Sequence, residues 1–227
     1  MPVTATPPAF AGKVAYSSKD RDYFSGARAD YIELLPASTR AAILELGCGD
    51  GSTGALAMAR GKCGTYCGIE ISDGPAEIAR TRIAEVVVGD IESVSLPWQP
   101  QSFDALLMSE VLEHLSDPWG VLRKLRPLLK PGARVFASSP NVSHHTILRS
   151  LLRGRWELTD QGTMDRTHLR WFTPSSYAQM FENCGYLVDW VGPVTPLSVK
   201  ARIASALLGR RSQHLFMYQI NLHARCP

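Results

Sequence analysis

The sequence predicts an α/β fold in which a doubly wound, mostly parallel sheet carries helices on both faces. Short apolar runs of strand length recur along the chain, at 41–46, 64–70, 84–90, 103–109 and 133–139. Helix-capable stretches at 52–60 and 118–130 lie between them. This alternation is typical of a parallel sheet, because each crossover helix has to pack on one of its faces.

The ends of the predicted elements are marked by capping residues. An apolar cluster that stops at Pro36 predicts a short helix before the first strand. Asp117 followed by Pro118 predicts the start of the helix at 118–130, and Gly132 follows its end. The chain is completed by a helix at 174–183, a strand at 185–191, a helix at 197–208 and an alternating strand at 213–224.

Length and apolar content predict one domain. The chain has 227 residues, of which 45% are hydrophobic, enough for one sizeable core. We expect residues 1–20, which are rich in proline, to form a flexible arm and 21–227 to form the domain. The connection at 141–172 is unusually long for a compact domain, and such connections are usually functional. We therefore expect it to cover the substrate.

Charge and cysteine content exclude several classes of protein. The formal net charge is only +3, which predicts neither a nucleic-acid partner nor an anionic membrane partner. Without a leader-like start or a long apolar run, the protein is expected to be cytoplasmic. The five cysteines are scattered and odd in number, as is typical of reduced thiols. Cys63 and Cys67 lack a second ligand pair at zinc-site spacing, so we expect no metal.

The most informative segment is ILELGCGDGSTG at 43–54, a buried strand that runs into Gly47, Gly49 and Gly51 and then into a helix. Glycines permit a sharp turn and a close approach of a ligand to the backbone, and the helix start offers unpaired N–H groups. This arrangement predicts a nucleotide site. GDGSTG at 49–54 also satisfies the dinucleotide pattern, so taken alone it leaves NAD and S-adenosylmethionine (AdoMet) open.

Acidic residues at the ends of successive strands favour AdoMet. Glu45 precedes the glycine turn, where an acid suits a cationic ligand better than a pyrophosphate. Glu70 ends the next strand and can accept hydrogen bonds from ribose hydroxyls, and Asp90 ends the third strand, where it can accept one from an adenine amine. A dehydrogenase would also need a second nucleotide-binding half and a catalytic domain, for which the chain has little room.

The ordered motifs ELGCGDG, GIEIS, GDIE, SFDALLMSEVLEHL and LKPGARV resemble those of class I AdoMet-dependent methyltransferases. SPNVSHHTILRSLLRGRW followed by MDRTHLRWFT resembles a bacterial subgroup linked to glycan and natural-product biosynthesis. Ala133 departs from the usual second glycine of the LKPG motif, at a turn away from the ligand. The resemblance implies a Rossmann-like, seven-stranded sheet whose last strand is antiparallel. It also implies AdoMet across the carboxyl ends of the strands.

Carried over position by position, the resemblance implies a cofactor site. Glu45, Gly47 and Gly49 would line the methionine moiety, Glu70 the ribose, and Asp90 with Ile91 the adenine. Ser109 and Glu110 would close the floor of the site, and we add three neighbours of these positions: Cys48, Gly51 and Ile71.

Candidate residues for the acceptor side lie in the long connection. Methyl transfer to a hydroxyl requires alignment of the acceptor and removal of its proton, for which a histidine is well suited. We predict His168 as the base, with Asp165 either orienting it or capping the turn, and His145 as a further catalytic candidate. His144, Arg153 and Arg166 are predicted to bind substrate, the arginines through an anionic handle.

Glu113 and His114 follow the fourth strand and are interpreted as a capping or core pair. The sequence thus predicts an AdoMet-dependent methyltransferase that acts on a small polar metabolite, most simply on a hydroxyl of a sugar or natural product. Two alternatives stay open: N-methylation of a small amine or amino sugar, and a non-catalytic AdoMet-binding protein that assists another enzyme. The sequence does not fix the oligomeric state.

Overall fold

The computed structural model describes residues 26–227, without the side chains of residues 210 and 211. The flexible arm predicted at 1–20 lies outside the described residues. The helix predicted before Pro36 is α2 (Ala29–Leu34), and its Tyr31 and Ile32 are buried in the core. No helix within 26–227 combines the length and the apolar character that crossing a membrane requires.

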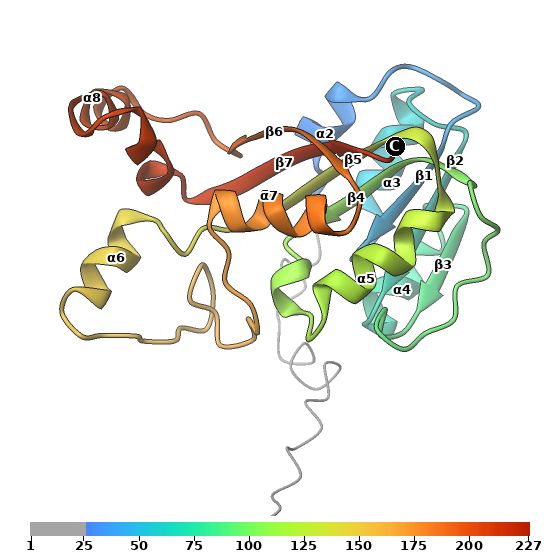
Figure 1. Ribbon diagram of the computed structural model, residues 1–227. Helices are drawn as coiled ribbons and strands as arrows, with labels where there is room; N and C mark the ends of the chain where they lie inside the picture. The colour runs from blue at the N-terminus through green and yellow to red at the C-terminus, as the bar shows by residue number, and fades with distance from the viewer. Residues whose placement is uncertain (1–25) are drawn as a thin grey trace, which may run out of the picture.

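A seven-stranded sheet forms the centre of the molecule, with strand order β3-β2-β1-β4-β5-β7-β6 (Figure 1). Neighbours among β1 to β5 pair in parallel, whereas β7 is antiparallel to both β5 and β6. This confirms the predicted Rossmann-like sheet with an antiparallel last strand. The strands are β1 (Ala42–Leu46), β2 (Thr65–Glu70), β3 (Glu85–Val88), β4 (Phe103–Ser109), β5 (Leu129–Pro140), β6 (Leu187–Pro193) and β7 (Gln219–Arg225).

Helices cover both faces of the sheet, as predicted. Side chains alternate across a strand, so in β1 Ile43 joins one buried cluster and Leu44 the other. Ile43 packs in the cluster to which α2, α3 (Ser52–Ala59) and α4 (Asp73–Ala79) contribute. Leu44 packs in the cluster to which α5 (Pro118–Leu125) and α7 (Pro174–Asn183) contribute. The doubly wound arrangement leaves the ends of the strands, rather than the faces, for a ligand.

Two predicted boundaries are wrong for identifiable reasons. The helix predicted at 118–130 ends at Leu125 and is followed by a 3-10 turn, η3 (Arg126–Leu128). Pro127 cannot donate a backbone hydrogen bond to the helix, and β5 begins directly afterwards. The start of this helix is confirmed, because the Asp117 side chain accepts a 2.9 Å hydrogen bond from the Gly120 N–H.

The end of the chain also differs from the prediction. The strand predicted at 213–224 begins only with β7 at Gln219, because residues before it form the 3-10 helix η4 (Arg210–Phe216). Helix α8 (Val199–Leu208) and β6 begin two residues later than predicted. These shifts lie at element ends and leave the topology unchanged.

The connection at 141–172 begins and ends beside the sheet. A parallel bridge between Asn141 and Phe172 joins its two ends, and α6 (His145–Leu151) lies within it. None of the α6 residues is buried, and α6 and α8 project beyond the sheet on the same side of the molecule (Figure 1). The covering role predicted for this connection stays a prediction.

Candidate functional site

The glycine turn after β1 has the strained backbone that the sequence predicts. Gly47, Gly49 and Gly51 have φ angles of +74°, +53° and +79°, which residues other than glycine rarely adopt. A Cβ on Gly47 would lie 2.5 Å from the Val111 side chain, after β4, whereas one on Gly51 would lie 3.0 Å from the backbone of α4. The first glycine therefore keeps the turn close to β4, and the third serves helix packing.

Glu70 at the end of β2 holds this turn. One of its carboxylate oxygens accepts a hydrogen bond from the Gly49 N–H and the other from the Ser72 N–H, both at 2.9 Å. Its side chain is buried, and burial raises the pKa of the carboxyl. Because a carboxylate offers about four acceptor positions, two remain for the hydroxyls of a ligand. Ile71, the next residue, is half-buried.

Two of the residues predicted to contact the cofactor have buried side chains, and their contact with it stays a prediction. Glu45 is only 3% exposed and accepts a 2.9 Å hydrogen bond from the Tyr66 hydroxyl. Burial raises the pKa of Glu45 to about 7. Cys48 is buried with its thiol against Gly68, and burial raises the pKa of that thiol. Only the backbone of Cys48 belongs to the turn.

The two cofactor residues predicted after β3 differ in their exposure to solvent. Asp90 is exposed, and its carboxylate accepts a 2.9 Å hydrogen bond from the Glu92 N–H, which shapes the turn. Ile91 is 4% exposed and packs in the buried cluster under α5 and α7. Asp90 is therefore accessible to a ligand, whereas Ile91 supports the turn from below.

At the end of β4 the structure adds a residue that sequence reasoning missed. The Arg28 guanidinium donates hydrogen bonds to the Ser109 and Ser138 hydroxyls, the second at 2.9 Å, and it lies over the Tyr31 ring. Arg28 thus brings a positive charge to the carboxyl ends of β4 and β5. The same guanidinium forms a 2.7 Å ion pair with Asp30, two residues away. No motif in the sequence marks its contacts at the strand ends, because the two serines are 81 and 110 residues away.

Glu110 follows Ser109 in a left-handed conformation, with a φ of +53° that is unusual for a residue other than glycine. Its Oε1 is buried and has no hydrogen-bond partner among residues 26–227. Burial raises the pKa of this carboxyl. A strained backbone and an unsatisfied buried oxygen at the end of a central strand are typical of a ligand-binding position.

Beyond Glu110 lies a polar cluster formed by Glu113, His114 and His168, whose ligating atoms all lie within 4.8 Å of one another. Glu113 and His114 belong to η2 (Leu112–His114), and His168 belongs to the long connection. The His114 and His168 rings meet edge to face with centroids 4.6 Å apart. The sequence predicts His168 as a functional residue but does not predict this cluster.

Asp165 caps a turn, which is one of the two roles that the sequence left open. Its Oδ1 accepts hydrogen bonds from the Thr167 N–H at 2.9 Å and from the Thr167 hydroxyl at 2.7 Å. The Nδ1 atom of His168 lies 3.1 Å from the Thr163 carbonyl oxygen. Asp165 therefore shapes the loop that carries His168, the Thr163 carbonyl contributes to the orientation of the imidazole, and an orienting role of Asp165 stays a prediction.

The other predicted acceptor-side residues lie at the surface of the connection. His144 is half-buried and His145 is exposed, with ring centroids 4.2 Å apart, and the His145 Nδ1 lies 3.0 Å from the Leu215 carbonyl oxygen. Arg153 is exposed, and Arg166 forms a 3.0 Å ion pair with Asp160. The structure does not bring these four residues into the cluster around His168.

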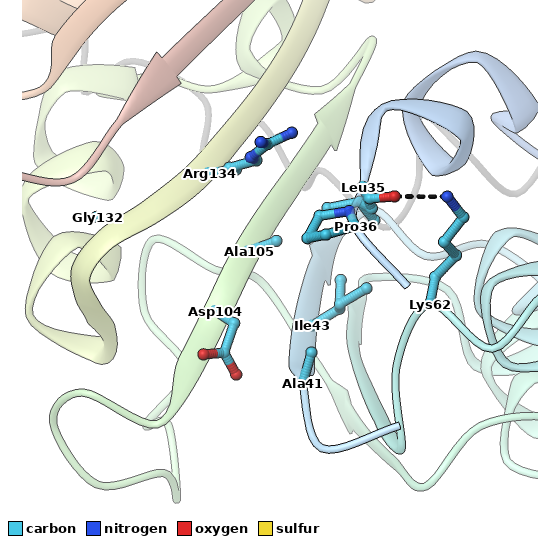
Figure 2. A pocket seen from close by; sticks show the side chains of 9 residues that line it. All are labelled: Leu35, Pro36, Ala41, Ile43, Lys62, Asp104, Ala105, Gly132 and Arg134. Atoms are coloured by element: carbon cyan, nitrogen blue, oxygen red, sulfur yellow. Dashed lines mark hydrogen bonds between the residues drawn. The ribbon is translucent and has the colours of Figure 1, made fainter. Parts of the chain in front are cut away.

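A pocket of about 150 Å³ lies elsewhere (Figure 2). It is lined by Ala41, Ile43, Asp104 and Ala105 at the amino-terminal ends of β1 and β4, together with Lys62 and Arg134. Ligands of open α/β sheets bind at the opposite, carboxyl ends of the strands. This pocket is therefore separate from the glycine turn and the cluster.

Comparison with known proteins agrees with this geometry. The family described as "Methyltransferase domain" matches residues 20–189. The ubiquinone biosynthesis O-methyltransferase of Aeromonas salmonicida is 31% identical over 159 residues, which are 64% of this chain and 63% of that protein. The protein of the same name from Saccharophagus degradans is 30% identical over 165 residues, 70% of this chain and 68% of that protein.

The match thus spans somewhat less than two thirds of the Aeromonas protein. Among solved structures, a SAM-dependent methyltransferase from Archaeoglobus fulgidus superposes with a TM-score of 0.64 at 17% identity, covering 91% of this chain and 94% of that one. At that identity the superposition supports the fold alone. The family match and the two relatives go further: the chain belongs to the class I methyltransferases, whose cofactor is S-adenosylmethionine.

Proposed function

We propose that this chain transfers a methyl group from AdoMet to a hydroxyl of a small polar metabolite, such as a sugar or a natural product. The observation that carries the proposal is the glycine turn held by Glu70 at the carboxyl ends of β1 and β2. There the Glu70 carboxylate accepts the Gly49 and Ser72 N–H groups at 2.9 Å each. This fixes the turn before a ligand arrives, so little ordering has to accompany binding.

The chemistry of the site residues fits AdoMet part by part. Glu70 suits the ribose hydroxyls, and the exposed Asp90 suits the adenine amine. The buried and unpartnered Oε1 of Glu110 suits a cationic group. Arg28, at the ends of β4 and β5, suits the carboxylate of the methionine moiety. Glu45 and Cys48 would act indirectly, by supporting the turn from the core.

AdoMet supplies a methyl group that its sulfonium already activates. The chain's own task is then to hold an acceptor in line and to deal with the proton of its hydroxyl. The polar cluster of Glu113, His114 and His168 follows the end of β4, on the side of the long connection. With its Nδ1 against the Thr163 carbonyl, His168 keeps Nε2 as its basic atom. Its role as the base is part of this proposal.

Oxygen is favoured over nitrogen as the acceptor atom because both relatives described above are named O-methyltransferases. An anionic handle on the acceptor remains our hypothesis for Arg153 and Arg166, which are both exposed. Arg166 would have to exchange its ion pair with Asp160 for the acceptor.

The test is a methyl-transfer assay with radiolabelled AdoMet and matched acceptors. Hydroxylated sugars and phenols would be compared with their amino counterparts, and S-adenosylhomocysteine (AdoHcy) affinity would be measured on the same protein. We expect AdoHcy binding and methylation of a hydroxyl, and we expect both to be weakened in Glu70→Ala but kept in Glu77→Ala, an exposed acid on α4. Methylation of the amines alone, or AdoHcy binding without turnover on any acceptor, would contradict the proposal.

A further inference from the structure

The cluster of Glu113, His114 and His168 is held together by the backbone. The N–H groups of Leu169 and Arg170 donate hydrogen bonds of 2.8 and 3.0 Å to the Glu113 carbonyl oxygen. These bonds fasten the long connection to the η2 turn beside His168. The three side chains are therefore positioned by two chain segments that are fixed to each other, as a preorganised site requires.

Both imidazoles are oriented by backbone carbonyls. The Nδ1 atom of His114 lies 3.3 Å from the Thr167 carbonyl oxygen and 3.2 Å from the Thr167 hydroxyl, and that of His168 lies 3.1 Å from the Thr163 carbonyl oxygen. A histidine that donates from Nδ1 presents the lone pair of Nε2. This outer hydrogen bond to a carbonyl is the one that metal-binding histidines usually make.

Glu113 is the most unusual member of the cluster. Its side chain is only 1% exposed, yet neither carboxylate oxygen has a hydrogen-bond partner among residues 26–227. A buried polar group left in this state is costly. A cation between the carboxylate and the two imidazoles would compensate this cost.

We propose that Glu113, His114 and His168 bind a divalent transition-metal ion of the Zn²⁺, Mn²⁺, Fe²⁺ or Co²⁺ class. Two imidazoles and one carboxylate suit these ions and leave coordination positions open. Cysteine spacing, the basis for expecting no metal, carries no information about ligands that only the fold brings together. The ligand set spans Glu113 to His168, which no short motif contains.

The open positions suggest a role at the acceptor, and this role rests on the proposed function. A metal ion can hold an acceptor oxygen and lower the pKa of its hydroxyl. With the ion bound, His168 would act as a ligand in place of its proposed role as the base, and the acidified hydroxyl of the acceptor would give its proton to water. The metal site itself stands on the geometry of the three residues.

The experiment uses the full chain after chelation of metals. Co²⁺ is titrated while its visible absorption is recorded, and Zn²⁺ is tested for a rise in melting temperature. We expect one equivalent of Co²⁺ to bind, and at least a ten-fold loss of affinity in Glu113→Gln and in His168→Gln, since even outer partners of metal ligands are worth that much. His145→Gln, an exposed histidine outside the cluster, is the control and should bind Co²⁺ like wild type.

Folding of the variants is checked in the same experiment. Glu113→Gln replaces a buried acid with a neutral group of similar shape, so without metal it should melt no lower than wild type while losing the rise with Zn²⁺. Equal Co²⁺ affinity in wild type and Glu113→Gln, or loss of binding in His145→Gln instead, would overturn the metal site. AdoHcy affinity of the chelated protein tests the proposed function separately, because its binding residues lie outside the cluster.

Discussion

Replacing Glu45 with glutamine should stabilise the protein, and increasingly so as the pH rises. Burial raises the pKa of Glu45 to about 7, from an ordinary value of 4.5. Below the ordinary value the carboxyl is neutral in both the folded and the unfolded chain. As the pH rises towards 7, the unfolded chain loses this proton first, so the free energy of unfolding falls. Above 7 the folded protein carries the full cost of a buried charge.

The size of the effect follows from the shift. About 2.5 pKa units correspond to roughly 3 kcal/mol as an upper bound, and for a chain of this length that is roughly 6–12 °C in melting temperature. Glutamine keeps an acceptor oxygen for the Tyr66 hydroxyl and cannot ionise. The difference in melting temperature between Glu45→Gln and wild type should therefore be small near pH 4.5 and should reach its plateau by pH 8.

Thermal melts of both proteins across that pH range, without cofactor, measure the difference. Glu182→Gln, an exposed acid on α7, is the control for removing a negative charge. A Glu45→Gln effect that does not change with pH, or that is matched by Glu182→Gln, would refute the reasoning. It would mean that the Tyr66 hydrogen bond satisfies an ionised carboxylate.

Three further predictions follow from the site and its turn. Glu70→Ala should weaken AdoHcy binding about ten-fold or more in calorimetry, as expected for a lost charge-assisted contact. Unchanged AdoHcy affinity would remove Glu70 from the site. NAD should not raise the melting temperature of wild type. Arg153→Ala should raise the KM of an anionic acceptor while AdoHcy binding stays intact, and the affinity of wild type for that acceptor should fall as the salt concentration rises. Kinetics that do not depend on salt would show that Arg153 does not bind the acceptor. Gly51→Ala should lower the free energy of unfolding more than Gly61→Ala does. Both glycines have a positive φ, but only a Cβ on Gly51 would meet a neighbouring helix. Equal losses of stability would mean that backbone strain alone causes the destabilisation.

The parts of the fold that sequence reasoning predicted are those encoded locally. The alternation of strands and helices, the glycine turn and the Asp117 cap each depend on residues within one or two elements. The apolar pattern of the helix that ends at Leu125 continues into β5, so the pattern alone predicts too long a helix, and Pro127 ends it. The start of β7 was missed because alternating apolar residues also fit the 3-10 helix η4.

The residues of the candidate site also differ in whether local sequence could predict them. Glu70 is found at the strand end where the pattern predicts it, because strand ends can be read from sequence. The contacts of Arg28 with two serines and the pairing of Glu113 with His168 could not be predicted, since these partners lie many residues away and only the completed sheet brings them together. The burial of Glu45 and Ile91 could not be predicted either. Which side of a strand end a residue faces depends on packing that a single sequence does not display.

The position of β7 has a consequence for how the protein is made. Strand β7 lies between β5 and β6, and within residues 26–227 β6 pairs with no other strand of the sheet. During synthesis, β5 and β6 are complete well before Gln219–Arg225 leave the ribosome. Until then β5 presents an unpaired edge, the kind of surface on which nascent chains pair with one another. The half of the sheet that contains β6 can therefore close only after Gln219–Arg225 have been synthesised, and we expect a chaperone that shields this edge to raise the yield of folded protein.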